Sequence, residues 1–290
     1  MRFATLDIGG QSTLVLISDT GDAYQAVGQI VPGVERLAQL IDGFEGHRAA
    51  LSAAQHWQPL GNAGWLPPLL PRRNIFCVGK NYHEHAKEFS QSGFDSSSVN
   101  GEFAPPAPVV FTKAPSSAIG HGATIEAFAH ITEQLDYEAE LAVVIGKGGR
   151  GIRKADALDH VFGYTIVNDV TARDLQQKHR QWFLGKSMDT FCPMGPWVVT
   201  ADALDGANLG VQCHVNGELR QDANTRDLIF DIPTLIETIS AGMALEPGDV
   251  IATGTPAGVG IGFKPPRFLK AGDEVRVSIE GIGSLTNRVG

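Results

Sequence analysis

The chain has 290 residues, of which 43% are hydrophobic and 19% are charged, and its formal net charge at pH 7 is −9. This is an ordinary globular composition, with enough apolar material for a large core. The acidic balance and the lack of any basic run argue against a nucleic-acid partner, because phosphate contacts need clustered Lys and Arg.

The sequence has no pattern typical of a membrane span, a signal peptide or a cysteine-based metal or disulfide motif. No apolar run approaches the roughly 20 residues that span a bilayer, and the N-terminus lacks a signal-peptide pattern. Cys77, Cys192 and Cys213 are widely spaced and form no CxxC pair, so neither a zinc site nor a disulfide framework is predicted. We expect a cytoplasmic protein with no membrane partner.

Residues 1–60 are predicted to form a small α/β unit. Strand patterns cover 2–8 and 13–19, and apolar residues then recur at helical spacing from Val34 to Ile41. The segment 61–73 contains three prolines, each of which restricts the residue before it to extended geometry. We place a domain boundary here, between a small N-terminal α/β domain (1–70) and a larger domain (71–290).

The next segment predicts a short strand at 74–78 and a helix that Asn81 would cap. His85 and Glu88 are three residues apart, so on a helix they share a face and can touch. A carboxylate beside an imidazole orients the ring and raises its basicity, as a general base requires. The alternative is a solvated helix face with an incidental His. Residues 90–108 have no periodicity and are either a lid or a surface loop.

A strand is predicted at 109–113 and a longer, buried strand at 135–145. Glu138 and Glu140 point to the same side of the longer strand, because side chains alternate between its faces. Two buried carboxylates repel unless a cation joins them, and carboxylates suit magnesium, manganese or calcium. The alternative is a solvated strand face.

Polar residues cluster after another buried strand, 164–167. Asp169 lies at its C-terminal end, and Thr171 with Asp174 fits a capping box for a helix at 172–183. Arg173 and Gln176 fall in the first turns of this helix and can face a site. Gly185-Lys186-Ser187 resembles the end of a phosphate-binding loop, but the pattern needs Gly where this chain has Arg180, which excludes a nucleotide site.

The C-terminal third is predicted to be β-rich. Asn216-Gly217 is a strong hairpin signal, and a helix is expected at 232–241. The segment 252–260 is rich in glycine and includes Thr253 and Thr255. Its backbone N–H groups can hold a substrate carboxylate, or the segment is simply a tight turn.

Taken together, six segments resemble the fumarylacetoacetate hydrolase family, in the order found in that family. They are VGKNYHEHAKE, LDYEAELAVVIG, IVNDVTARD, GKSMDTFCPMGP, VNGELRQ and TGTPAGVG, which span residues 74–290. The resemblance implies an α+β, β-rich fold, with a mixed β-roll around the site, and a homodimer. It also assigns roles: Glu138, Glu140 and Asp169 as ligands of Mg²⁺ or Mn²⁺; His85, Glu88 and Lys186 as catalytic residues; Gln176 and Thr255 as substrate contacts, to which the helix position adds Arg173.

The chemistry follows from this set. Three carboxylates leave roughly half of an octahedral magnesium shell open, which suits a chelating 2-oxo or 2,4-dioxo acid and stabilisation of an enolate. We expect a metal-dependent hydrolase that cleaves a carbon–carbon bond in acylpyruvate-like acids. Oxaloacetate decarboxylation and 2-oxo acid tautomerisation or isomerisation are alternatives on the same site, and a non-catalytic binding protein is the alternative of another class.

Overall fold

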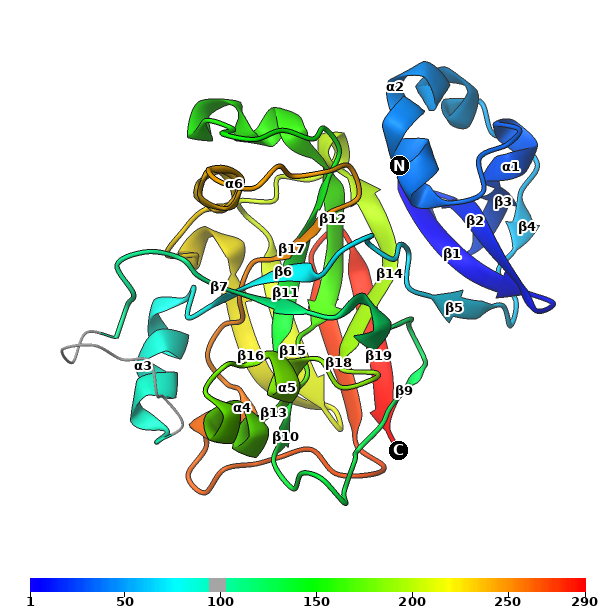
Figure 1. Ribbon diagram of the computed structural model, residues 1–290. Helices are drawn as coiled ribbons and strands as arrows, with labels where there is room; N and C mark the ends of the chain where they lie inside the picture. Colours follow the sequence, from blue (N-terminus) through cyan, green and yellow to red (C-terminus); the bar gives the residue numbers. More distant parts are fainter. Residues whose placement is uncertain (94–102) are drawn as a thin grey trace.

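The computed structural model describes residues 1–93 and 103–290 and shows a sheet-rich α+β fold (Figure 1). Its largest sheet runs in the order β4-β3-β2-β1-β14-β12-β11-β17-β6-β7, with β5 beside β1 and β8 beside β14. The strands of this sheet are β1 (Arg2–Ile8), β2 (Gln11–Ile17), β3 (Ala23–Ala26), β4 (Gln58–Pro59), β5 (Gly64–Leu66), β6 (Ile75–Gly79), β7 (Val109–Lys113), β8 (Ala118–Ile119), β11 (Ala139–Ile145), β12 (Val161–Asn168), β14 (Cys192–Thr200) and β17 (Val250–Ala252).

Two further sheets complete the β-structure. One has the order β16 (Glu218–Asn224), β15 (Gly210–Val215), β18 (Glu274–Ile279), β19 (Gly283–Val289) and β9 (Thr124–Ile125), and the other pairs β10 (Leu135–Asp136) with β13 (Thr171–Ala172). The helices are α1 (Val27–Ile30), α2 (Leu37–Ser52), α3 (His83–Gln91), α4 (Arg173–His179), α5 (Phe183–Lys186) and α6 (Ile232–Ser240), with 3₁₀ turns η1 (Pro115–Ser117), η2 (Lys154–His160), η3 (Ala201–Ala203), η4 (Thr225–Asp227) and η5 (Gly260–Gly262). The predicted β-rich α+β fold is confirmed.

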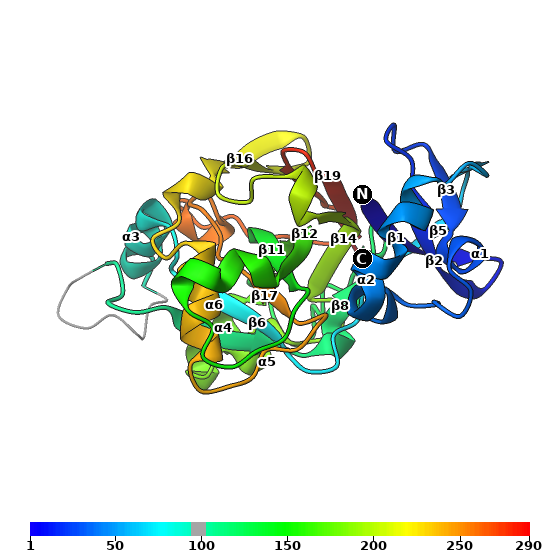
Figure 2. The same ribbon diagram turned by 90° about the horizontal axis from the view of Figure 1, so that it is seen from above.

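The N-terminal strands continue the main sheet. Strand β1 pairs antiparallel with β14 through Arg2↔Val199 and Phe3↔Val198, so residues 1–66 lie at one side of the molecule in both views (Figures 1 and 2). Helix α2 packs on this part through a buried cluster that includes Phe3, Leu40 and Phe44. The division into domains at residue 70 stays a prediction.

Strand β11 lies at the centre of the core, and every residue in it is buried. Leu141 and Val143 face the cluster shared with β15 and β18, whereas Ala142 and Val144 face the cluster shared with α2 and β14. Glu140 belongs to the second set by alternation, and this side of the strand is where the site lies.

Several predicted elements are confirmed, and others differ in detail. The strand at 109–113, the hairpin at Asn216-Gly217 and the helix beginning at Ile232 are confirmed. The strand predicted at 135–145 is two strands, β10 and β11, separated by Tyr137 and Glu138. The helix predicted at 172–183 is also two, α4 and α5, because Arg180 takes a left-handed conformation (φ 57°) that ends α4.

Both predicted side-chain caps are wrong. The Thr171 hydroxyl donates to the Asp169 carbonyl, and the N-cap of α4 is Ala172, without a side-chain hydrogen bond. The N-cap of α3 is Tyr82. Asn81 instead joins distant segments: its amide donates to the carbonyls of Phe230 and Thr253, and its oxygen accepts from the Phe230 N–H.

Two remaining predictions concern the segment 90–108 and the absence of a membrane-spanning helix. The segment 90–108, predicted to be a lid or a surface loop, includes residues 94–102, which lie outside the described residues. Within the described ranges, none of the helices is long and apolar enough to cross a membrane.

Replacing Asn81 with Ala is expected to lower the free energy of unfolding by about 2–4 kcal/mol, because three backbone groups lose a buried partner. The measurement is the urea midpoint at constant m-value. The matched control is Asn224→Ala, which removes one local hydrogen bond to the Arg226 N–H and should cost about 1 kcal/mol or less. Equal midpoints for the two variants would contradict the role of Asn81.

Candidate metal centre

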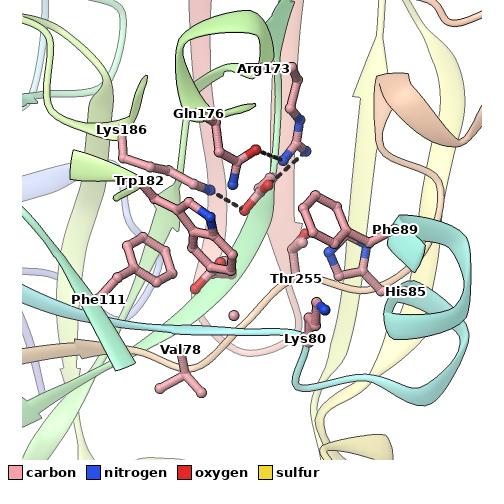
Figure 3. A pocket seen from close by; sticks show the side chains of 13 residues that line it. Val78, Lys80, His85, Phe89, Phe111, Arg173, Gln176, Trp182, Lys186 and Thr255 are labelled. Atoms are coloured by element: carbon pink, nitrogen blue, oxygen red, sulfur yellow. Dashed lines mark hydrogen bonds and ion pairs between the residues drawn. The ribbon is translucent and has the colours of Figure 1, made fainter. Parts of the chain in front are cut away.

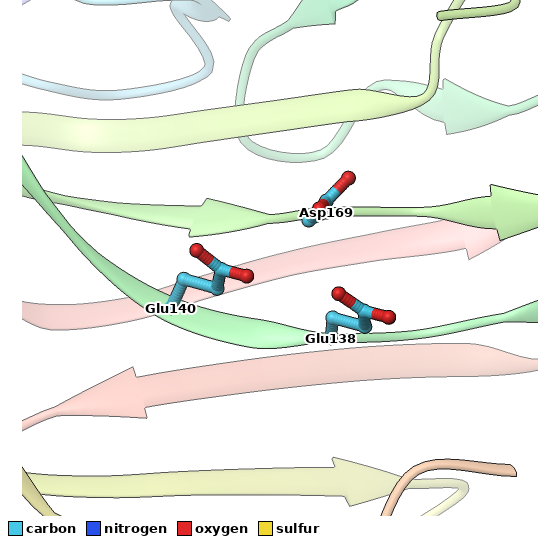
Figure 4. Close-up of side chains that lie close together, drawn as sticks. All are labelled: Glu138, Glu140 and Asp169. Carbon is cyan, nitrogen blue, oxygen red and sulfur yellow. The ribbon is translucent and has the colours of Figure 1, made fainter. Parts of the chain in front are cut away.

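Three buried carboxylates, Glu138, Glu140 and Asp169, lie side by side (Figure 4). Strand β12 pairs antiparallel with β11, which brings Asp169 at the end of β12 next to Glu138, and the Asp169 N–H donates to the Glu138 carbonyl at 2.9 Å. One oxygen of each carboxylate lies within 4.8 Å of the others. The three predicted ligands are therefore together, on the side of β11 that alternation indicates.

Two lysines neutralise part of this charge. Lys186 Nζ lies 2.9 Å from Glu138 Oε2 and 2.8 Å from Asp169 Oδ2. Lys113 Nζ lies 2.6 Å from Asp169 Oδ1, and its side chain is fully buried. Sequence reasoning predicted Lys186 but missed Lys113, although a lysine that ends an apolar strand at residue 113 was a signal. Burial opposes the charge of Lys186, but Asp169 and Glu138 outweigh it and raise its pKa.

Arg173 adds a third cation and reaches one of these carboxylates, Glu138. Its Nη2 atom lies 2.7 Å from Glu138 Oε1 as an ion pair, and its Nη1 atom donates to Gln176 Oε1 at 3.1 Å. Arg173 is fully buried, and it was predicted as a substrate contact. It does line the pocket, but its charge is already shared between Glu138 and another carboxylate, Asp136.

Asp136 was missed by sequence reasoning. Its side chain accepts from Arg173 Nε at 2.8 Å and from three backbone N–H groups, those of Tyr137, Gly260 and Ile261. A carboxylate that accepts four hydrogen bonds is well compensated for its burial. Asp136 thus ties the guanidinium to the glycine-rich segment after β17.

Glu140 is the carboxylate that the protein leaves without a cation. It accepts from the Gly254 N–H at 2.8 Å, and within the described parts of the chain it forms no ion pair. Burial, together with the charges of Asp169 and Glu138, raises the pKa of Glu140 well above its ordinary value. Burial also opposes ionisation of Glu138, but Lys186 and Arg173 outweigh it and lower its pKa to about 2. An added cation beside Glu140 would complete the compensation, and the all-oxygen donor set suits a hard divalent ion.

The predicted contact between the general base His85 and its partner Glu88 is also present. His85 and Glu88 lie on α3, with His85 Nδ1 3.2 Å from Glu88 Oε2. Glu88 is held in turn by the Gly258 N–H, 3.0 Å from its Oε1 atom. The ring is nearly buried, and its Nε2 atom has no hydrogen bond to the described residues. Nε2 is therefore the ring nitrogen available to a bound molecule.

The glycine-rich segment does not do what was predicted for it. Its N–H groups at Gly254 and Gly258 hold the protein carboxylates Glu140 and Glu88, not a free carboxylate site. Thr255 does line the pocket, and its hydroxyl accepts from Gln221 Nε2 at 2.8 Å. The segment is therefore a support for the carboxylates of the site.

These groups surround one pocket (Figure 3). Seven predicted residues line it: His85, Glu138, Glu140, Arg173, Gln176, Lys186 and Thr255. Glu88 and Asp169 lie behind this lining and act on it through His85 and Lys186. The other lining residues, which sequence reasoning missed, are Val78, Gly79, Lys80, Phe89, Phe111 and Trp182. Val78, Gly79 and Lys80 are consecutive at the end of β6, whereas Phe89, Phe111 and Trp182 come from separate parts of the chain that no local sequence pattern connects.

Comparisons with known proteins agree with this geometry. The family model of the fumarylacetoacetate (FAA) hydrolase C-terminal domain matches residues 74–290. Oxaloacetate tautomerase YisK of Bacillus subtilis strain 168 is 54% identical over 221 residues, which are 76% of this chain and 70% of the relative.

Solved structures match over the whole chain. Fumarylacetoacetate hydrolase from the psychrophilic Exiguobacterium antarcticum is 44% identical with a TM-score of 0.85, covering 100% of this chain and 99% of that chain. Maleylpyruvate hydrolase from Sphingobium sp. SYK-6, in complex with manganese (II) ion and pyruvate, is 34% identical with a TM-score of 0.79, covering 100% and 98%. This chain belongs to the fumarylacetoacetate hydrolase family.

Proposed function

We propose that this protein is a divalent-metal-dependent tautomerase that interconverts the keto and enol forms of a short 2-oxo dicarboxylic acid of the oxaloacetate type. The observation that carries the proposal is His85 Nε2, a base nitrogen with no hydrogen bond to residues 1–93 or 103–290, in a pocket walled by Glu138 and Glu140. The 54% identity to an oxaloacetate tautomerase supports it. Tautomerisation was an alternative to hydrolysis in the sequence analysis, and this relative now favours it.

Glu138, Glu140 and Asp169 would hold the ion, either Mg²⁺ or Mn²⁺. The fit rests on the unpaired charge of Glu140 and on the oxygen donors, and the manganese complex of the maleylpyruvate hydrolase supports it. When bound, the ion supplies Lewis acidity toward the carboxylate and ketone oxygens of a 2-oxo acid.

The residues of the chain account for the proton transfer. Glu88 accepts a hydrogen bond from the Nδ1–H group of His85, which leaves the lone pair on Nε2 to take a proton from C3 of the keto acid. The ammonium of Lys186 stabilises the negative charge that develops on the C2 oxygen. A proton from the imidazolium or from solvent then reaches that oxygen, so the enol has the same atoms and charge as the keto acid.

Hydrolysis of an acylpyruvate to pyruvate and a second acid is the second candidate. The similarity to maleylpyruvate hydrolase favours it. In this reaction His85 would take a proton from water as the water attacks the distal carbonyl carbon. The homodimer and the cytoplasmic location stay predictions.

The function is tested with purified protein and Mg²⁺ on oxaloacetate, acetylpyruvate and fumarylpyruvate. We expect the enol absorbance of oxaloacetate to relax much faster than either acylpyruvate is cleaved, by kcat/KM, with little release of carbon dioxide. Faster cleavage of an acylpyruvate would establish the hydrolase instead. Release of carbon dioxide at the rate of oxaloacetate consumption would establish a decarboxylase.

The metal site predicts opposite effects for two Glu→Gln variants. Without metal, Glu140→Gln should leave Tm unchanged or raise it, because burial and the charges of Asp169 and Glu138 oppose ionisation of Glu140 and the amide is neutral. Glu138→Gln should lower Tm with or without metal, because Lys186 and Arg173 lose a partner. At a metal concentration of 100 times Kd, the wild type should gain about 2.7 kcal/mol and Glu140→Gln much less. Equal metal-induced shifts in Tm for wild type and Glu140→Gln would rule Glu140 out as a ligand.

The role of the His85–Glu88 pair is tested at Gly262, where the absence of a side chain leaves space for the Glu88 carboxylate. A Cβ at Gly262 would lie 1.7 Å from Glu88 Oε1, so Gly262→Ala must displace that carboxylate from His85. We expect kcat to fall roughly 10²-fold, as for loss of a general base, with metal affinity unchanged. Adding Gly262→Ala to Glu88→Ala should cost nothing more. The control is Gly242→Ala, where the new methyl meets open space; additive losses would place the effect of Gly262 elsewhere.

A further inference from the structure

Lys80 is a cation in the lining of the pocket, on the same wall as His85 (Figure 3). It follows β6 directly, is 5% exposed, and has a left-handed backbone with φ 57°. For a residue with a Cβ this conformation is unfavourable and persists only when the surroundings impose it. A strained backbone at a pocket points to a function for the side chain it carries.

The neighbours of Lys80 impose this turn. On one side, Asn81 is fixed by its hydrogen bonds to Phe230 and Thr253. On the other side, Gly79 packs so closely on Trp182 that a Cβ would lie 2.6 Å from the indole ring. The link between β6 and α3 is thus set at both ends, and it places Lys80 in the pocket lining.

The pocket cations are divided between two walls. Lys186 and Arg173 are ion-paired to the carboxylates of the metal centre. Lys80 lies across from Lys186, on the wall that carries His85 and Phe89 (Figure 3). Its Nζ atom is 5.4 Å from the centre of the Phe89 ring, a cation–π distance that helps to keep the ammonium in this wall.

A short 2-oxo dicarboxylic acid matches this arrangement, given the proposed function on which the inference rests. Its first carboxylate and ketone belong at the carboxylate wall, and its C3 atom must lie within reach of His85. The second carboxylate is attached to C3, so it falls on the wall shared by His85 and Lys80. We propose that Lys80 binds this second carboxylate and so selects dicarboxylic over monocarboxylic 2-oxo acids.

The test compares oxaloacetate with 2-oxobutyrate, which has a methyl group in place of the second carboxylate. Exchange of C3 protons for deuterium is followed by NMR in D₂O with Mg²⁺, after subtraction of the rate without enzyme. Lys80→Met should raise KM for oxaloacetate about 10- to 100-fold, the effect of losing a hydrogen bond between charged groups. KM for 2-oxobutyrate should stay within about twofold, and Lys80→Arg should retain most of the preference for oxaloacetate.

Two further variants keep the test decisive. Lys80→Asn removes the charge while tolerating the left-handed backbone, so it replaces Lys80→Met if that variant fails to fold. As a control, Lys147→Met removes the same charge from an exposed site after β11 and should change KM for neither substrate. Equal losses on both substrates for the Lys80 variants would overturn the inference and make Lys80 a structural residue.

Failure of the proposed function would look different. If the wild type exchanges neither acid, the tautomerase is wrong, and calorimetric titration of Mg²⁺-loaded protein with the two acids still tests Lys80. Tighter binding of oxaloacetate that is lost in Lys80→Asn supports the carboxylate site. Equal affinities for the two acids in the wild type overturn it.

Discussion

The structure depends on the burial of three carboxylates within 4.8 Å of one another. Like charges at this separation inside a protein are unfavourable by several kcal/mol unless cations join them. The chain meets this demand with Lys113 from β7 and with Lys186 from α5, both of which contact Asp169. Arg173 from α4 contacts Glu138. Elements far apart in sequence therefore converge on β11. Among the described residues this compensation does not include an ion pair to Glu140, where a divalent ion would complete it.

The glycine-rich segment after β17 couples the metal centre to the base. Its backbone N–H groups bind Glu140 through Gly254, Glu88 through Gly258 and Asp136 through Gly260. One stretch of backbone thus orients a metal-site carboxylate, the partner of the base and the partner of Arg173. Side chains at these glycines would collide with their neighbours: a Cβ at Gly258 would lie 1.9 Å from the Arg220 carbonyl oxygen. The composition of the segment reflects close approach as well as turn geometry.

Local periodicity accounts for what could be predicted of the site. Glu138 and Glu140 share a strand face by the period of two, and His85 and Glu88 share a helix face by the spacing of three. Lys113, Asp136 and Lys80 follow no such periodicity. Their roles depend on how β7, β10 and β6 are placed beside other parts of the chain. The same limit explains the error at the start of α3, where Asn81 is engaged in long-range hydrogen bonds. At the start of α4 the Thr171 hydroxyl donates instead to the nearby Asp169 carbonyl. The fold class followed from patterning and resemblance, whereas its sheet order needed the structure.

The reaction itself was harder to predict than the site, for a chemical reason. Tautomerisation, decarboxylation and carbon–carbon hydrolysis all develop negative charge on the same oxygen of a 2-oxo acid, so each can use the carboxylates, Lys186 and His85 in the same places. Residues that stabilise a shared charge cannot tell the reactions apart. The discrimination must come from groups that meet the far end of the substrate, on the wall of Lys80 and Phe89. The three carboxylates stand on or beside core strands, whereas His85 is on α3 and Lys186 on α5. Lys80, the proposed selectivity residue, lies on the link between β6 and α3, apart from all of them in the sequence.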